Sequence, residues 1–188
     1  LDRYLQNVME QNNIAGMSVA VTDQTGIVYS NGFGVESVER PILRSTPETL
    51  YKIASVSKVF NAANIMCLLD QGLLELDTPV KQYIPELNLS NAGSAELVTL
   101  RHLLTHTAGF TDAIYPNGPR DERSLGQRVE ELFPNLDMFS MPGDGVFLYS
   151  NYGFVLAAYL AERVTGRLFT ELVQEHIIRP LGRDRTFY

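Results

Sequence analysis

The apolar positions at the start of the chain follow first a helical and then an extended pattern. Residues 1–13 carry an apolar side chain at Leu1, Leu5, Val8 and Met9, which is the spacing of one face of a helix. Residues 17–22 and 27–30 predict two antiparallel strands, joined by a polar turn over 23–26. Because two strands are rarely stable alone, this α+β start predicts a sheet that is far from complete.

The rest of the chain has mainly helical spacing. Residues 55–71 give a helical pattern that Gly72 ends. Residues 107–123, rich in Gly, Pro, Asn and Asp, predict a loop. The other predicted helices cover 78–85, 100–105 with Thr99 as cap, 126–133, 152–164 closed by Gly166, and 169–178.

Composition and charge narrow the class of protein. The chain has 188 residues, 45% of them hydrophobic, and a formal net charge of −7, so it predicts a folded domain. Without a run of Lys or Arg it lacks the basic face that a nucleic-acid partner requires. The longest apolar stretch, 154–161, is too short for a membrane span. Cys67 is the only cysteine; it allows no internal disulfide and is predicted to be a buried core residue.

Ser55 and Lys58 form the first candidate catalytic pair. Ser55 stands at the predicted start of a helix, where the helix dipole and free N–H groups favour developing negative charge. Lys58 lies three residues later and therefore on the same helical face, within reach of the serine oxygen. A lysine amine in a poorly hydrated pocket can accept the serine proton. Ser-x-x-Lys also arises by chance, and serine is a common helix cap.

Tyr149-Ser150-Asn151 is the second candidate site. A tyrosine can transfer protons, and an asparagine can bind a substrate amide. The same Tyr-x-Asn pattern also occurs at Tyr29 and at Tyr115, so the pattern alone is not specific. The third copy differs by its context, because it follows the Pro142-Gly143 turn and directly precedes the apolar helix predicted from Tyr152.

These stretches together resemble the superfamily of class C β-lactamases and penicillin-binding proteins, which includes D-Ala-D-Ala carboxypeptidases and β-lactamase-like esterases. The similarity extends over the whole chain in six landmarks that follow one another in the family's order. They are 14–21, 53–58, 72–85, 100–109, the segment from Pro142-Gly143 to Tyr149-Ser150-Asn151, and Pro180-Leu181-Gly182.

The resemblance implies an α/β plus all-α architecture, the β-lactamase/transpeptidase-like fold. Residues 1–54 would be the N-terminal helix and hairpin of the α/β domain, residues 55–168 the helical domain, and residues 169–188 a returning helix and the start of the remaining α/β part. The sheet strands that the family adds later are missing from the sequence. A periplasmic or secreted location is implied, and the residues leave a cytoplasmic one open.

The resemblance also implies a role for each site residue. Ser55 would be the acylated nucleophile, Lys58 would share its proton network, and Tyr149 would act as general base and then general acid. Asn151 would contact the amide of a small-molecule or peptide substrate. No metal and no organic cofactor is implied.

A third family element, Lys-Thr-Gly or His-x-Gly, does not occur in the sequence. With Leu1 at its start and this element absent, the chain is expected to be an N-terminal piece of a longer protein from which a leader was removed or whose gene starts earlier. A C-terminal chain or a second copy would then complete the sheet.

Other functional classes find less support. A Gly-x-Ser-x-Gly elbow is absent. His102 and His106 have the i, i+4 spacing of zinc ligands but lack the Glu of His-Glu-x-x-His, so they are predicted to be structural. The sequence therefore predicts a serine hydrolase that forms an acyl-enzyme with an amide, ester or β-lactam carbonyl. Two alternatives stay open: a sensor that is acylated without turnover, and an inactive fragment that needs a C-terminal partner.

Overall fold

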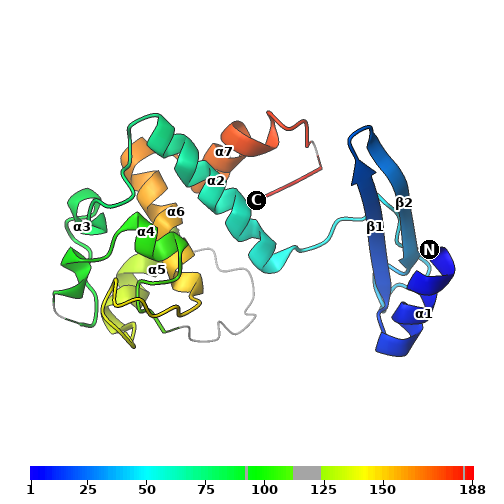
Figure 1. Ribbon diagram of the computed structural model, residues 1–188, viewed down its shortest axis with the longest axis horizontal. Coiled ribbons are helices and arrows are strands. Elements are labelled where there is room, and N and C mark those ends of the chain that lie inside the picture. The colour runs from blue at the N-terminus through cyan, green and yellow to red at the C-terminus, as the bar shows by residue number, and fades with distance from the viewer. Residues whose placement is uncertain (92, 112–123, 184) are drawn as a thin grey trace. The chain divides into compact units, whose positions relative to one another are not determined.

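The computed structural model describes residues 1–91, 93–111, 124–183 and 185–188 (Figure 1). The chain divides into two compact units, Leu1–Lys52 and Ile53–Tyr188. The domain boundaries predicted after residues 54 and 168 stay predictions. None of the helices in the described part of the chain is long and apolar enough to cross a membrane.

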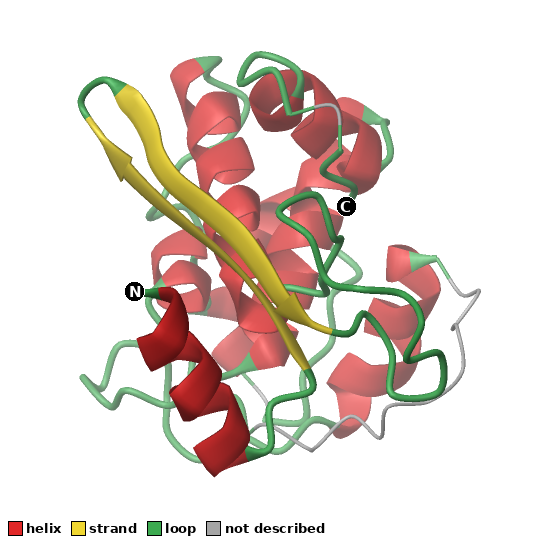
Figure 2. Cartoon of the chain, turned by 90° about the vertical axis from the view of Figure 1, so that its right-hand side faces the viewer, coloured by secondary structure: helices red, strands yellow, loops and turns green. Residues whose placement is uncertain are grey.

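The first unit consists of helix α1 (Asp2–Asn12) and an antiparallel hairpin of β1 (Gly16–Asp23) and β2 (Gly26–Gly34), drawn in yellow in Figure 2. This confirms the predicted helix and both predicted strands. The ladder runs from the pair Gly16 and Gly34 to Asp23 and Gly26, with an irregularity between Val21 and Thr22. Among the described residues the sheet has these two strands only.

Helix α1 ends because Asn13 takes a left-handed backbone conformation with φ of 52°, which asparagine tolerates better than most residues. Met9 and Phe33 are the buried apolar side chains of this unit. At Gly34 an added Cβ would lie 2.1 Å from the Ala15 carbonyl oxygen. Glycine is therefore required where the hairpin closes onto the turn after α1.

The second unit is helical. Its long helices are α2 (Ser57–Asp70) and α6 (Asn151–Thr165), and α5 (Leu125–Leu132) has two turns. The capping residues act as the sequence predicts: Thr99 caps α4, and Gly166 ends α6 with φ of 65°. The shorter elements are the 3-10 turns η1 (Ala54–Val56), η2 (Ser94–Glu96) and η3 (Phe133–Asn135), the helices α3 (Val80–Tyr83), α4 (Leu100–Leu104) and α7 (Phe169–Val173), and the π-helical η4 (Gln174–Ile178).

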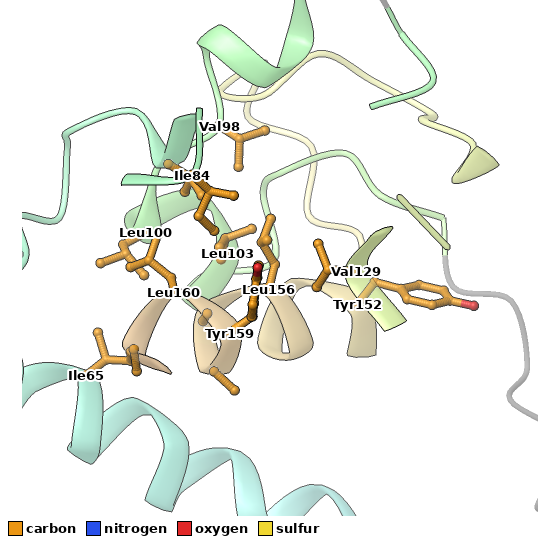
Figure 3. Packing of buried hydrophobic residues seen from close by; sticks show 14 of the residues in the cluster. Ile65, Ile84, Val98, Leu100, Leu103, Val129, Tyr152, Leu156, Tyr159 and Leu160 are labelled. Carbon is orange, nitrogen blue, oxygen red and sulfur yellow. The ribbon is translucent and has the colours of Figure 1, made fainter. Parts of the chain in front are cut away.

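Helix α6 is the centre of the hydrophobic core. It packs against α2, α3, α4, α5 and α7, so its side chains are covered on nearly all sides. Leu156 and Leu160 are fully buried and lie among Leu103, Val129 and Ile84 in Figure 3. This arrangement explains why residues 152–161 are almost entirely apolar, since a surface helix would carry only one apolar stripe. The core thereby fixes the start of α6, where Tyr149 and Asn151 stand.

Several helix boundaries differ from the sequence prediction; the helix expected over 78–85, for example, is α3 over Val80–Tyr83. The helix expected from Ser55 begins at Ser57, and Ser55 lies in the preceding 3-10 turn η1, where the N–H of Val56 bonds to the Ile53 carbonyl three residues earlier at 3.0 Å. The last helix, expected as one element over 169–178, changes to π-helical winding at Gln174, where the N–H of Arg179 bonds to the carbonyl five residues earlier.

Candidate active site

The four residues singled out in the sequence come from two helix starts within the second unit. Ser55 lies in η1 and Lys58 in the first turn of α2. Tyr149 lies two residues before α6, and Asn151 is the first residue of that helix. Since α2 packs against α6, residues about 93 positions apart in sequence meet at one place.

Ser55 is the point on which two of these side chains converge. The Lys58 ammonium nitrogen lies 3.1 Å from Ser55 Oγ, and the Tyr149 hydroxyl lies 2.7 Å from the same oxygen. Both are hydrogen-bond distances. The serine oxygen therefore has an amine and a phenol as direct partners, and each can exchange a proton with it.

Lys58 is held by more than the serine. Its Nζ donates to Asn151 Oδ1 at 2.5 Å, and it lies 4.8 Å from the centroid of the Tyr149 ring and 5.6 Å from that of Phe154. These are cation–π distances. The ammonium is therefore positioned by an amide oxygen and two aromatic rings in addition to Ser55.

The backbone before Ser55 is conformationally unusual. Ala54 has φ of 44°, a region that costs an L-residue with a Cβ roughly 1–2 kcal/mol. Non-glycine residues in such conformations are concentrated at functional sites. The turn places Ser55 just before the N-terminus of α2, where unpaired N–H groups and the helix dipole favour negative charge.

The copy of Tyr-x-Asn at Tyr29 has a different partner. Tyr29 lies in β2 and donates its hydroxyl to Asp2 Oδ1 at 2.6 Å; this bond raises the pKa of Tyr29. The hydroxyl thus serves to tie the hairpin to α1. The copy at Tyr115 lies outside the described residues. Position in the chain, and not the pattern itself, separates the third copy from the others.

The two histidines predicted to be structural have different surroundings. His102 belongs to α4, where its Nδ1 accepts the N–H of Thr99 at 3.3 Å in a capping box. His106 follows α4, and its ring stacks on that of Tyr149, with centroids 4.4 Å apart and an angle of 27°. Sequence reasoning missed this contact. It depends on the path of the chain after α4, for which the sequence carries no local signal.

A cavity of about 430 Å³ lies beside the lysine. Lys58 and Asn151 line it together with apolar side chains, among them Leu125, Phe154, Leu168 and Phe169. Tyr188 also lines it, and burial raises the pKa of this phenol. Over the described part of the chain, no three His, Cys, Asp or Glu side chains gather in a way that could hold a metal ion.

The chain is similar in sequence and in structure to known proteins. The chain is 30% identical to the unguisins hydrolase ungD' of Aspergillus campestris, over all of this chain and 36% of the relative. The octameric penicillin-binding protein homologue from Pyrococcus abyssi superposes with a TM-score of 0.81 at 30% identity, over 97% of this chain and 42% of that one. A class C β-lactamase gives a TM-score of 0.81 at 27% identity, over 99% and 49%.

The chain spans 36 to 38% of the length of curated relatives that it matches. The structural neighbours confirm the β-lactamase/transpeptidase-like fold predicted from the sequence. The model of the family described as Beta-lactamase matches residues 1–188, the whole of the sequence. The chain therefore belongs to the Beta-lactamase family of serine hydrolases and penicillin-binding-protein-like proteins.

Proposed function

We propose that this chain carries the nucleophile of a serine hydrolase that acts through a covalent acyl-enzyme on Ser55. The observation that supports the proposal is the pair of hydrogen bonds at Ser55 Oγ, one from Lys58 and one from Tyr149. A serine hydroxyl is a weak nucleophile until a neighbouring group takes its proton. The phenol oxygen of Tyr149, 2.7 Å from Ser55 Oγ, is close enough to take that proton when it is ionised.

The proposed reaction has two balanced halves. Tyr149, as the phenolate, takes the proton of Ser55 while the serine oxygen bonds to the carbonyl carbon. Lys58, as the ammonium 3.1 Å from that oxygen, stabilises the negative charge that develops around it. Tyr149 then gives the proton to the leaving nitrogen or oxygen as its bond to carbon breaks. Water releases the acyl group by the same steps, with Tyr149 accepting a proton from water and returning it to Ser55.

Asn151 has two tasks in this proposal. Its side-chain oxygen accepts from Lys58, so it holds the ammonium in place. Contact with a substrate carbonyl then falls to the side-chain nitrogen, which can only donate. The substrate class is an amide, an ester or a β-lactam. The proposal also includes the third family element, Lys-Thr-Gly or His-x-Gly, which a C-terminal chain or a second copy would supply.

The test is time-resolved intact mass spectrometry of the purified protein with a penicillin and, separately, with an activated short-chain ester. We expect an adduct with the mass of the acyl group, absent in Ser55→Ala, followed by its loss as product appears. Ser57→Ala is the matched control, because it removes a hydroxyl two residues away. An adduct that persists would indicate a sensor without turnover. A Ser55→Ala protein that is still labelled would refute the assignment.

A further inference from the structure

His106 and Tyr149 are connected through the backbone on both sides of the tyrosine. The carbonyl oxygen of His106 accepts the N–H of Leu148 at 2.8 Å. Its ring nitrogen Nδ1 accepts the N–H of Ser150 at 3.0 Å. One residue therefore fixes the chain immediately before and immediately after Tyr149, which leaves the backbone of the tyrosine little freedom to rotate.

The ring of His106 also fixes the side chain of Tyr149. The two rings are nearly parallel, 27° apart, with centroids separated by 4.4 Å, an offset-stacked arrangement that is favourable for aromatic pairs. Phe147 meets the same imidazole edge-on at 5.6 Å, and Phe154 lies 5.3 Å from it. Tyr149 itself is 41% exposed, so the protein core does not hold its ring. The stack with His106 contributes that support, together with Lys58, whose Nζ lies 4.8 Å from the ring centroid.

The backbone of His106 has a strained conformation. Its φ is 58°, in the left-handed region where a residue with a Cβ is disfavoured and glycine is not. A glycine there would relieve the strain but would remove both the ring stack and the acceptor for Ser150. The strain at His106 is thus offset by the stacking of its ring on Tyr149 and by its hydrogen bond with the N–H of Ser150.

We propose that His106 is a positioning residue that holds the Tyr149 hydroxyl at the Ser55 oxygen. The proposal rests on the proposed function for its chemical consequence. Tyr149 reaches Ser55 Oγ at 2.7 Å, and a displacement of about 1 Å in a reacting group can lower a rate by roughly 100-fold. His106 does not touch the reacting atoms; it acts through the tyrosine.

Two substitutions separate the two contacts of the side chain. His106→Phe keeps an aromatic ring but leaves the buried Ser150 N–H, in a residue only 3% exposed, without its acceptor. His106→Asn keeps an oxygen close to the place of Nδ1 and tolerates the left-handed backbone, but removes the ring. His102→Phe is the matched control, because it also removes an acceptor for a backbone N–H.

The first measurement is the dependence of the acylation rate on ester concentration, which gives the acylation rate constant and the dissociation constant separately. For His106→Phe we expect an acylation rate constant at least about tenfold lower, with a dissociation constant within twofold of the wild type. His106→Asn should recover part of the lost rate, and His102→Phe should leave it unchanged. An unchanged rate in His106→Phe, or an equal loss in His102→Phe, would overturn the proposal.

A second measurement does not depend on catalysis. In protein labelled with ¹³C at the tyrosine ζ carbon, the signal missing from Tyr149→Phe identifies Tyr149. We expect this signal to shift or broaden in His106→Phe and to stay in place in His102→Phe. If wild-type Ser55 is never acylated, the proposed function fails, and this signal still decides the role of His106. An unmoved Tyr149 signal in His106→Phe would overturn it.

Discussion

The hydroxyl of Tyr149 is the group whose removal tests the site most directly. In Tyr149→Phe only this oxygen is lost, 2.7 Å from Ser55 Oγ. The ring remains, and with it the stacking on His106 and the contact with Lys58. A positioned general acid–base contributes about 10²–10⁴-fold to a rate. This corresponds to about 3–5 kcal/mol in the activation free energy of acylation.

The stability of the fold should change much less than the rate. Tyr149 is 41% exposed, so water can replace the hydroxyl as a partner of its surroundings. The net contribution of one such hydrogen bond to the free energy of unfolding is about 0.5–1.5 kcal/mol. The two effects are therefore separable in a single variant: a large loss of rate with a small loss of stability.

The assay is the pre-steady-state rate of acyl-enzyme formation with an activated ester, followed by rapid quenching and intact mass. Urea unfolding of the same samples gives the free energy of unfolding. Tyr83→Phe is the control, because it also removes a phenol hydroxyl, one that accepts the N–H of Glu75 and not a bond at Ser55. An acylation rate of Tyr149→Phe within fivefold of the wild type would refute the role of the phenol. Another group would then have to take the serine proton.

Three further predictions concern the lysine, the core and one surface ion pair. Lys58→Met should lower the acylation rate at neutral pH by about 100-fold or more, because Ser55 loses the ammonium that stabilises negative charge at its oxygen; the measurement is mass labelling over time. Leu156→Ala removes a fully buried side chain and should lower the free energy of unfolding in urea by about 2–5 kcal/mol. Arg101 lowers the pKa of Asp77 below its ordinary 3.8 through a hydrogen bond at 2.6 Å. The stabilisation from this pair is therefore complete above that pH and lost as pH falls through the lowered pKa, so the difference in unfolding midpoint between wild type and Asp77→Asn should shrink in acid.

Each of these predictions can fail in a recognisable way. Labelling of Lys58→Met at the wild-type rate would remove the lysine from the mechanism. For the core, Leu97→Ala is the control, since Leu97 is 49% exposed; an equal loss in both leucine variants would show that burial is not the cause. A difference between wild type and Asp77→Asn that is constant from neutral to acidic pH would mean that the ion pair does not stabilise the fold.

Much of the local structure followed from the sequence because its causes are local. The alternation of residues 17–22 and the polar turn after them are sufficient for a hairpin, and β1 and β2 lie where they were expected. Thr99 and Gly166 marked helix ends through capping chemistry that depends on a few neighbouring residues. The start of α2 was misplaced by two residues, because the 3-10 turn that precedes it has no pattern in the sequence that distinguishes it from the helix.

The candidate site shows where local reasoning ends. The three-residue spacing of Ser55 and Lys58 predicted that these two side chains meet, and they do so across the junction of η1 and α2. That Tyr149 joins them was implied by resemblance alone, and only the packing of α6 against α2 places the phenol 2.7 Å from the serine. The contact of His106 with Tyr149 was decided entirely by tertiary structure, because the turn after α4 directs its ring toward a segment more than forty residues later. A sequence fixes what depends on neighbours in the chain, whereas contacts between distant segments depend on how the core packs as a whole.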